Sequence, residues 1–286
     1  MSSIPGAPLS VLMPLKHYQP RFLREALDSL IIQRDPEWRL VIVVEPEELA
    51  RFRVLLSDAL GDPRVRVIPN EGRKLAGAFN TGMRVAATEF VAILLSDDLW
   101  AENAVRTLRT NIREYADVDF FHSARRIVDG DGNPLSSVHL PVESVTLEDF
   151  AAGGVVKHLL CWRRKKGLAF GGMDESLNSV GPDDYDFPWM MLEHGAVFRA
   201  IHEPLYVYRD HRDGYRLTTH LPRSVHVREL RRILTKHRVN PALITKRIRD
   251  AKHSYLRECI YRNEFHRWFV NLLGWNPTTS WRQTYR

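Results

Sequence analysis

Short apolar segments alternate with amphipathic ones through the first 115 residues, and this alternation limits the fold more than any other feature. Leu40–Val44 is apolar on both faces, as expected for a strand buried inside a parallel sheet. Repeated strand–helix units predict an α/β fold, a mostly parallel sheet flanked by helices with its binding crevice at the carboxyl ends of the strands. The predicted strands are Ser10–Met13, Leu40–Val44, Val65–Ile68 and Phe90–Leu95, and the predicted helices are Phe22–Ile31, Glu47–Leu60, Leu75–Ala87 and Glu102–Tyr115.

The composition is typical of a globular protein. Of 286 residues, 44% are hydrophobic and 27% are charged, which argues against a disordered or fibrous chain. The longest aliphatic runs are too short to cross a bilayer, and the N-terminal residues do not resemble a secretory signal. Two distant cysteines, Cys161 and Cys259, argue against a disulfide framework. We therefore expect a cytoplasmic protein whose membrane contact, where present, is peripheral at the inner face.

The charge is distributed unevenly along the chain. Residues 221–286 contain 15 Lys and Arg residues against 4 Asp and Glu residues, a net charge of +11, so the other 220 residues carry −5. From Ser224 onward this segment is also predicted to be helical and increasingly aromatic. We therefore divide the chain into a domain of residues 1–220 and a basic helical C-terminal region of residues 221–286. Such a segment binds an anionic partner or forms a solvated helical face, and the sequence leaves both open.

A turn is predicted at Asp129–Asn133, between two extended segments. The sequence Asp-Gly-Asp-Gly-Asn is rich in residues that favour tight turns, so a hairpin is expected there. Cation binding by its carboxylates is the alternative, and turn chemistry explains them better.

A first pair of acids, Asp97 and Asp98, follows the most apolar predicted strand. Adjacent carboxylates at such a place are costly unless they are compensated. A hard divalent cation such as Mg²⁺ or Mn²⁺ would compensate them, together with substrate phosphates. The alternative is that one of them caps the helix predicted to begin near Glu102.

A second group of acids, Asp183, Asp184 and Asp186, precedes a predicted helix that contains Pro188 and Trp189. Acids at a helix N-terminus are stabilised by the helix dipole, which is the structural explanation. The functional explanation is that one carboxylate acts as a general base toward an incoming hydroxyl group. The Trp and Met residues that follow fit core packing better than a cofactor site.

With both acidic groups in view, the chain resembles the family 2 glycosyltransferases, which have the GT-A fold, over about residues 8–220. Each motif alone is weak, but eight occur in the order found in that family. The segments that carry the resemblance are Ser10–Pro14, Phe22–Gln33, Val41–Glu45, Asn80–Gly82, Leu94–Trp100, Gly171–Glu175, Asp183–Asp186 and Tyr208–His211.

The resemblance implies roles for individual residues. Asp184 would be the catalytic base, Asp98 the main metal ligand and His211 a further metal ligand. Glu45 would contact the nucleoside of the donor. The remaining implied contacts are Pro14, Lys16, Asn80 and Asp97 on the donor side and Asp183 and Trp189 on the acceptor side.

The sequence departs from the family pattern at three positions. Leu95 stands where the first acid of the acidic run is usual, Pro46 follows Glu45, and Phe79 replaces a frequent arginine. These departures bear on the nucleotide and the metal shell more than on the fold. They also keep open a second hypothesis, a catalytically weak or inactive module of the same fold that binds sugar nucleotides or glycans.

The resemblance predicts an inverting, Mn²⁺- or Mg²⁺-dependent enzyme of bacterial-type polysaccharide or glycan assembly. It would use a nucleotide-diphospho-sugar donor and a glycan or lipid-linked acceptor. The aromatic residues between Phe265 and Trp275 either dock onto the catalytic domain or rest on a membrane. Nucleic-acid binding is not expected, because no RNA- or DNA-binding motif is visible.

Overall fold

A computed structural model describes residues 9–177, 180–210, 222–262 and 268, and these residues contain an eight-stranded mixed sheet. The strand order is β3-β2-β1-β4-β7-β6-β8-β5. The strands are β1 (Leu9–Leu15), β2 (Trp38–Val44), β3 (Val65–Pro69), β4 (Phe90–Ile93), β5 (Leu99–Trp100), β6 (Phe120–Val128), β7 (Leu160–Arg163) and β8 (Phe198–Arg209).

The N-terminal half of the sheet is parallel, as the alternating pattern predicts. Leu12 of β1 is in register with Val41 of β2 and Ile93 of β4, and Val44 of β2 is in register with Pro69 of β3. β6 and β8 are also parallel, whereas β7 is antiparallel to both β4 and β6, and β5 is antiparallel to β8. The carboxyl ends of β1, β2 and β4 therefore open onto one edge, where the predicted site begins.

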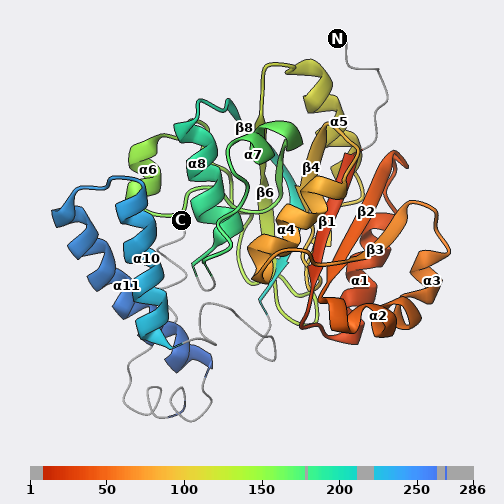
Figure 1. Cartoon of the computed structure of the whole chain (residues 1–286), viewed down its shortest axis with the longest axis horizontal. Coiled ribbons are helices and arrows are strands. Elements are labelled where there is room, and N and C mark those ends of the chain that lie inside the picture. The colour runs from red at the N-terminus through yellow and green to blue at the C-terminus, as the bar shows by residue number, and fades with distance from the viewer. Residues whose placement is uncertain (1–8, 178–179, 211–221, 263–267, 269–286) are drawn as a thin grey trace.

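Helices cover both faces of the sheet, which confirms the predicted α/β class (Figure 1). Side chains of α1 and α5 belong to the core on one face, and those of α4, α8, α10 and α11 to the core on the other. The helices are α1 (Pro20–Ile31), α2 (Leu49–Leu55), α3 (Ser57–Leu60), α4 (Lys74–Val85), α5 (Ala104–Glu114), α6 (Leu147–Ala152), α7 (Arg164–Ala169), α8 (Phe187–Glu193), α10 (Arg223–Lys236) and α11 (Pro241–Arg262), with a 3₁₀ turn η1 (Pro46–Glu48) and a π-helical turn η2 (Pro182–Asp186).

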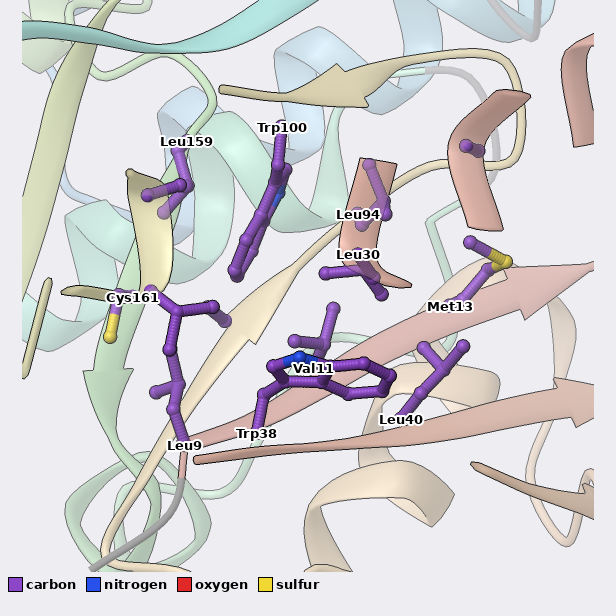
Figure 2. Packing of buried hydrophobic residues seen from close by; sticks show 14 of the residues in the cluster. Leu9, Val11, Met13, Leu30, Trp38, Leu40, Leu94, Trp100, Leu159 and Cys161 are labelled. Carbon is purple, nitrogen blue, oxygen red and sulfur yellow. The ribbon is translucent and has the colours of Figure 1, made fainter. Parts of the chain in front are cut away.

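The spacing of apolar residues along each helix and strand explains which core its side chains join. In β1, Val11 and Met13 point into the core beneath α1, and Leu12 between them points into the core beneath α4, because side chains alternate along a strand. Leu30 of α1 and Trp38 of β2 lie in the first of these cores (Figure 2). Complete burial of a leucine-sized side chain stabilises a fold by about 1.5–3 kcal/mol, so these periodic positions hold the sheet and its helices together.

Two local predictions need correction. The single helix expected over residues 47–60 is divided into η1, α2 and α3, and the break falls at Leu56, whose φ and ψ of −101° and 16° are not helical. The acids before α5 do not cap it, since β5 lies between them and its first turn, and the N-cap residue is Asn103. The turn at Asp129–Asn133 is confirmed, with the Asp129 carboxylate accepting hydrogen bonds from the backbone N–H of Asp131 and Asn133.

In the described part of the C-terminal region, α10 and α11 form as predicted and lie beside α8 (Figure 1). The side chains that join α10 and α11 to the core under α4 and α8 are Leu230, Ile233, Leu234, Ile244 and Ile248. Docking is thus established for these two helices. Apart from Trp268, which is exposed, the predicted aromatic segment lies outside the described residues. No helix among the described residues is long and apolar enough to span a membrane.

A buried histidine in β6 makes the fold sensitive to acid. Both ring nitrogens of His122 are buried without a hydrogen-bond partner among the described residues, and burial lowers its pKa to about 4. Below about pH 6.5, the ordinary pKa of histidine, His122 binds a proton in the unfolded chain. In the folded chain it stays neutral until the pH falls to about 4. The contribution of neutral His122 is therefore present above about pH 6.5 and lost as the pH falls toward 4.

We expect His122→Leu to remove this dependence. The wild type should lose about 2 kcal/mol of unfolding free energy more than the variant between pH 7 and pH 4.5. Urea unfolding at the two pH values measures this difference. His253→Gln, which alters an exposed histidine of α11, is the matched control and should behave as the wild type. Parallel pH dependence of the wild type and His122→Leu would contradict the prediction.

Candidate active site

Two charged side chains extend from the adjacent carboxyl ends of β1 and β2. Leu15 and Val44 are in register, so the residues that follow them, Lys16 and Glu45, lie side by side. The Lys16 ammonium is 3.6 Å from the Glu45 carboxylate, and the Lys16 side chain is 62% exposed. Pro14, one position earlier, is in register with Val43. All three lie at the edge where a donor is expected, and their donor contacts remain predictions.

Asp98 is buried behind the strand end, with both carboxylate oxygens occupied. The backbone N–H of Arg209 donates to Oδ1 at 2.7 Å, and the Tyr206 hydroxyl donates to Oδ2 at 2.8 Å. Burial, followed by the neighbouring charge of Asp97, raises the pKa of Asp98 to about 7, although these two hydrogen bonds act in the opposite direction. Asp97 itself is only partly buried. Of the two acids, Asp97 is therefore the more accessible to a ligand.

Arg209 fixes the acidic segment in place. Its Nε donates to the backbone carbonyl of Asp97 at 3.0 Å, and its Nη1 donates to the carbonyl of Gly130 at 3.0 Å. Its Nη2 is paired with Glu25 of α1, and the guanidinium lies 4.2 Å from the ring centroid of Phe22. The sequence motif included Arg209 without assigning it a role. A buried arginine with this many partners orients the backbone that presents Asp97.

His158 lies between the two acidic groups and contacts both Asp183 and Tyr206, the hydrogen-bond partner of Asp98. The His158 Nε2 is 3.0 Å from Oδ2 of Asp183, both side chains are buried, and the imidazole stacks on the Tyr206 ring at 5.4 Å between centroids. Burial by itself would lower the pKa of His158, but the hydrogen bond with Asp183 and the charges of Asp183, Asp184 and Asp98 raise it above its ordinary value. Tyr206 and His158 thus connect Asp98 with Asp183, a link that the sequence did not reveal.

Asp184 lies in the π-helical turn η2 and is partly buried. A Cβ atom added at Gly181 would be 1.9 Å from Asp184 Oδ1, so a glycine is required for the carboxylate to fold back over the start of the turn. Burial lowers the pKa of Lys157, while the charges of Asp184 and Asp183 act to raise it. Lys157 therefore lies within electrostatic reach of the two acids, next to His158, which is hydrogen-bonded to Asp183.

Asn80 holds a turn instead of facing the donor edge. Its side-chain amide donates to the Met173 carbonyl and to Glu175, each at 2.9 Å, and accepts from the Met173 N–H at 2.8 Å. Gly172, with φ of +72°, brings its backbone against the Asn80 side chain. The buried amide of Asn80 is satisfied by the Gly171–Glu175 turn, and its predicted donor contact stays a prediction.

Trp189 lies in the core. It is 2% exposed, and its ring stacks on His237 at 4.1 Å and on Phe150 at 5.7 Å between centroids. The ring thus contributes to core packing, and the acceptor contact predicted for Trp189 stays a prediction. His211, the predicted second metal ligand, lies outside the described residues.

No group of three or more His, Cys, Asp and Glu side chains that could hold a metal ion occurs within the described ranges. The donor set nevertheless suits Mg²⁺ or Mn²⁺, which bind through one or two carboxylates and complete their shell with water and substrate phosphates. Asp97, partly buried at the sheet edge, is a ligand of that kind. Asp98 is less suited, since both of its oxygens already accept hydrogen bonds.

Comparison with known proteins identifies one matching family. The model of "Glycosyl transferase family 2" matches residues 10–166, more than half of the chain. O-antigen biosynthesis protein RfbC of Myxococcus xanthus is 24% identical over 205 residues, which are 71% of this chain and 16% of RfbC. The UDP-Glc:alpha-D-GlcNAc-diphosphoundecaprenol beta-1,3-glucosyltransferase WfgD of Escherichia coli is 31% identical over 97 residues, 33% of this chain and 37% of WfgD. The chain thus spans only a minor part of these two relatives.

A solved structure shares the fold over most of the chain. The crystal structure of S. aureus TarS 1–349 in complex with UDP-GlcNAc superposes with a TM-score of 0.64 at 17% identity, covering 87% of this chain and 72% of that one. At this level of identity the similarity concerns the arrangement of helices and strands. The expected architecture is therefore confirmed independently of the sequence motifs.

Proposed function

The chain belongs to glycosyl transferase family 2 and has the GT-A fold, and we propose that it transfers a sugar from a UDP-sugar donor to a hydroxyl group of a glycan or lipid-linked acceptor, with inversion at the anomeric carbon. The relatives' names support the choice of donor and acceptor. WfgD is named for a UDP-Glc donor and a diphosphoundecaprenol-linked acceptor, and TarS was solved with UDP-GlcNAc. RfbC is named for O-antigen biosynthesis, which supports a role in polysaccharide assembly.

The observation that carries the proposal is the meeting of two acidic segments 85 residues apart in the sequence. Asp98 bonds to Tyr206, the Tyr206 ring stacks on His158, and His158 bonds to Asp183. One segment follows β4 at the donor edge, and the other contains the candidate base. A reaction between a nucleotide-linked sugar and a hydroxyl group needs these two functions side by side.

Asp184 is the proposed general base. In a single displacement, its carboxylate takes the proton of the acceptor hydroxyl while the acceptor oxygen bonds to the anomeric carbon and the bond to the donor diphosphate breaks. One displacement inverts the anomeric configuration. Asp183 and His158 hold the neighbouring position, so the backbone at Asp184 is already oriented before substrate binds.

Asp97 is the proposed carboxylate ligand of a divalent cation, with His211 as a further candidate. The cation, when bound, supplies positive charge that stabilises the departing diphosphate. The role of this chain is to present the Asp97 carboxylate at the strand end. Arg209 holds the backbone there through its hydrogen bond to the Asp97 carbonyl. Lys16 and Glu45 lie at the neighbouring strand ends, where they would contact the donor.

A panel of nucleotide sugars tests the proposed function. We expect UDP sugars to raise the melting temperature in the presence of Mn²⁺, by an amount that grows with donor concentration, and to be hydrolysed or transferred slowly. Binding without turnover under all acceptor conditions would favour the non-catalytic module instead. No stabilisation by any nucleotide sugar would contradict both.

The exposed side of α10 and α11 is strongly basic, and we propose that it binds anionic lipid headgroups near a lipid-linked acceptor. Among the side chains described there, the exposed acid is Asp250. Each Lys or Arg near an anionic bilayer contributes about 1 kcal/mol to binding at low ionic strength. Apart from Lys236, whose ammonium is paired with Asp186, the exposed Lys and Arg side chains described between residues 223 and 252 are Arg223, Arg228, Arg231, Arg232, Arg238, Lys246, Arg249 and Lys252.

Vesicle sedimentation tests the proposed lipid contact. We expect the protein to sediment with phosphatidylglycerol vesicles and to be released by salt, and to remain unbound with phosphatidylcholine vesicles. Replacing Arg231, Arg232, Arg249 and Lys252 by Gln should weaken binding at least tenfold. The matched control removes four exposed arginines from the other half of the chain: Arg24, Arg39, Arg53 and Arg66. Equal losses in both variants would show that only net charge matters.

A further inference from the structure

The end of α10 contacts the acidic turn that contains the candidate base. Asp186, the last residue of η2, has a side chain that is 2% exposed. The ammonium of Lys236 lies 2.7 and 3.0 Å from its two carboxylate oxygens, and Nε2 of His237 lies 3.1 Å from Oδ1. A buried carboxylate needs such partners, because removing one of them leaves a charge poorly compensated in a medium of low polarity.

The same end of α10 touches two further segments near the site. The Lys236 ammonium is 3.6 Å from Asp174, which belongs to the Gly171–Glu175 turn held by Asn80. The His237 ring stacks on Trp189 of α8 with an interplanar angle of 7°. Two turns earlier in α10, Glu229 accepts a hydrogen bond from the Val180 N–H at 3.2 Å, just before η2 begins. α10 therefore holds η2 at both of its ends.

These contacts place Asp184 between two anchored neighbours. Asp183 is hydrogen-bonded to His158, and Asp186 is hydrogen-bonded to Lys236 and His237, so the two buried acids of the turn are held by different segments of the chain. The backbone N–H groups of Tyr185 and Asp186 both reach the Gly181 carbonyl, at 3.2 and 3.1 Å. The intervening Asp184 is left partly exposed.

We propose that Lys236 and His237 are positioning residues for Asp184, so that α10 belongs to the catalytic unit although it lies beyond residue 220. This inference depends on the proposed role of Asp184 as base. A shift of about 1 Å in a catalytic group can reduce turnover about 100-fold, so the anchor of Asp186 is expected to act on turnover more than on donor binding. The division of the chain at residue 220 would then separate a base from one of its two supports.

Substitution of Lys236 tests the proposal. Lys236→Met should lower kcat for transfer or hydrolysis of a UDP sugar about 10–100-fold and leave the donor dissociation constant within about twofold. Lys236→Arg, which keeps a donor of like charge, should restore most of the turnover. Lys165→Met, at an exposed position of α7, is the matched control and should behave as the wild type.

A double variant separates positioning from stability. Lys236→Met leaves Asp186 poorly compensated and is expected to destabilise the fold, whereas Asp186→Asn with Lys236→Met removes both charges and should recover much of the melting temperature. Its turnover should nevertheless stay low, because the contact of the Lys236 ammonium with η2 is absent. Wild-type turnover in a folded Lys236→Met or double variant would overturn the proposal. An inactive wild type would instead contradict the proposed function.

Discussion

Replacing Asp184 by asparagine is expected to reduce turnover about 10²–10⁴-fold, the range that general-base assistance contributes, while donor affinity stays close to that of the wild type. Asparagine has nearly the same size as aspartate, so the turn over Gly181 should be preserved. It cannot take up the acceptor proton at neutral pH. The loss should therefore appear in kcat and equally in kcat/KM for the acceptor.

Steady-state kinetics and calorimetric titration with the same UDP sugar measure the two quantities. Asp117→Asn, which changes an exposed aspartate between α5 and β6, is the control for loss of one negative charge. Asp183→Asn is informative in another way, since Asp183 is buried against His158 and its substitution should lower the melting temperature as well. Turnover of Asp184→Asn within threefold of the wild type would mean that another group is the base.

Asp97→Asn is expected to remove the part of donor affinity that depends on Mn²⁺, a loss of at least tenfold or about 1.4 kcal/mol. Asparagine keeps a side-chain carbonyl but loses the charge that binds a hard cation. Because Arg209 contacts the backbone carbonyl of Asp97, the segment should keep its conformation in this variant. Donor titration with and without Mn²⁺ isolates the metal-dependent part.

Asp98→Asn should behave differently, although the resemblance to the family points to Asp98 as the main metal ligand. An asparagine at this position can accept from the Arg209 N–H through Oδ1 and donate to the Tyr206 oxygen through Nδ2. Burial also raises the pKa of Asp98, so the surroundings of this carboxyl disfavour its charged form. Retained Mn²⁺ dependence is expected. If it is lost in Asp98→Asn and kept in Asp97→Asn, Asp98 is the ligand.

The sequence determined the sheet and the location of its functional edge. Apolar runs such as Leu40–Val44, separated by helical periods, specify parallel strands, and parallel strands end together. The position of Asp97 four residues after the end of β4 therefore implied its place at the edge before any contact was known. The order of the motifs also indicated the family, because each motif is a short local segment that can be recognised without its tertiary contacts.

The tertiary structure decided which of these residues are accessible. Asp98 and Asp97 are adjacent in sequence, yet Asp98 is enclosed by Tyr206 and Arg209, more than 100 residues away. Asn80 of α4 likewise donates a hydrogen bond to the carbonyl of Met173, in a turn 93 residues further along the chain. Residue type and spacing do not encode such partners, so the predicted roles were assigned to buried and exposed side chains alike.

The C-terminal region shows the same division. Its basic charge and helical period were evident from the sequence, and they left both docking and membrane contact open, with docking slightly favoured. Docking of α10 and α11 depended on whether Ile233 and its apolar neighbours found a complementary core under α8, and the bond from Lys236 to Asp186 depended on where α10 ends. Local periodicity determines which elements form, whereas burial and charge pairing arise only when distant segments meet.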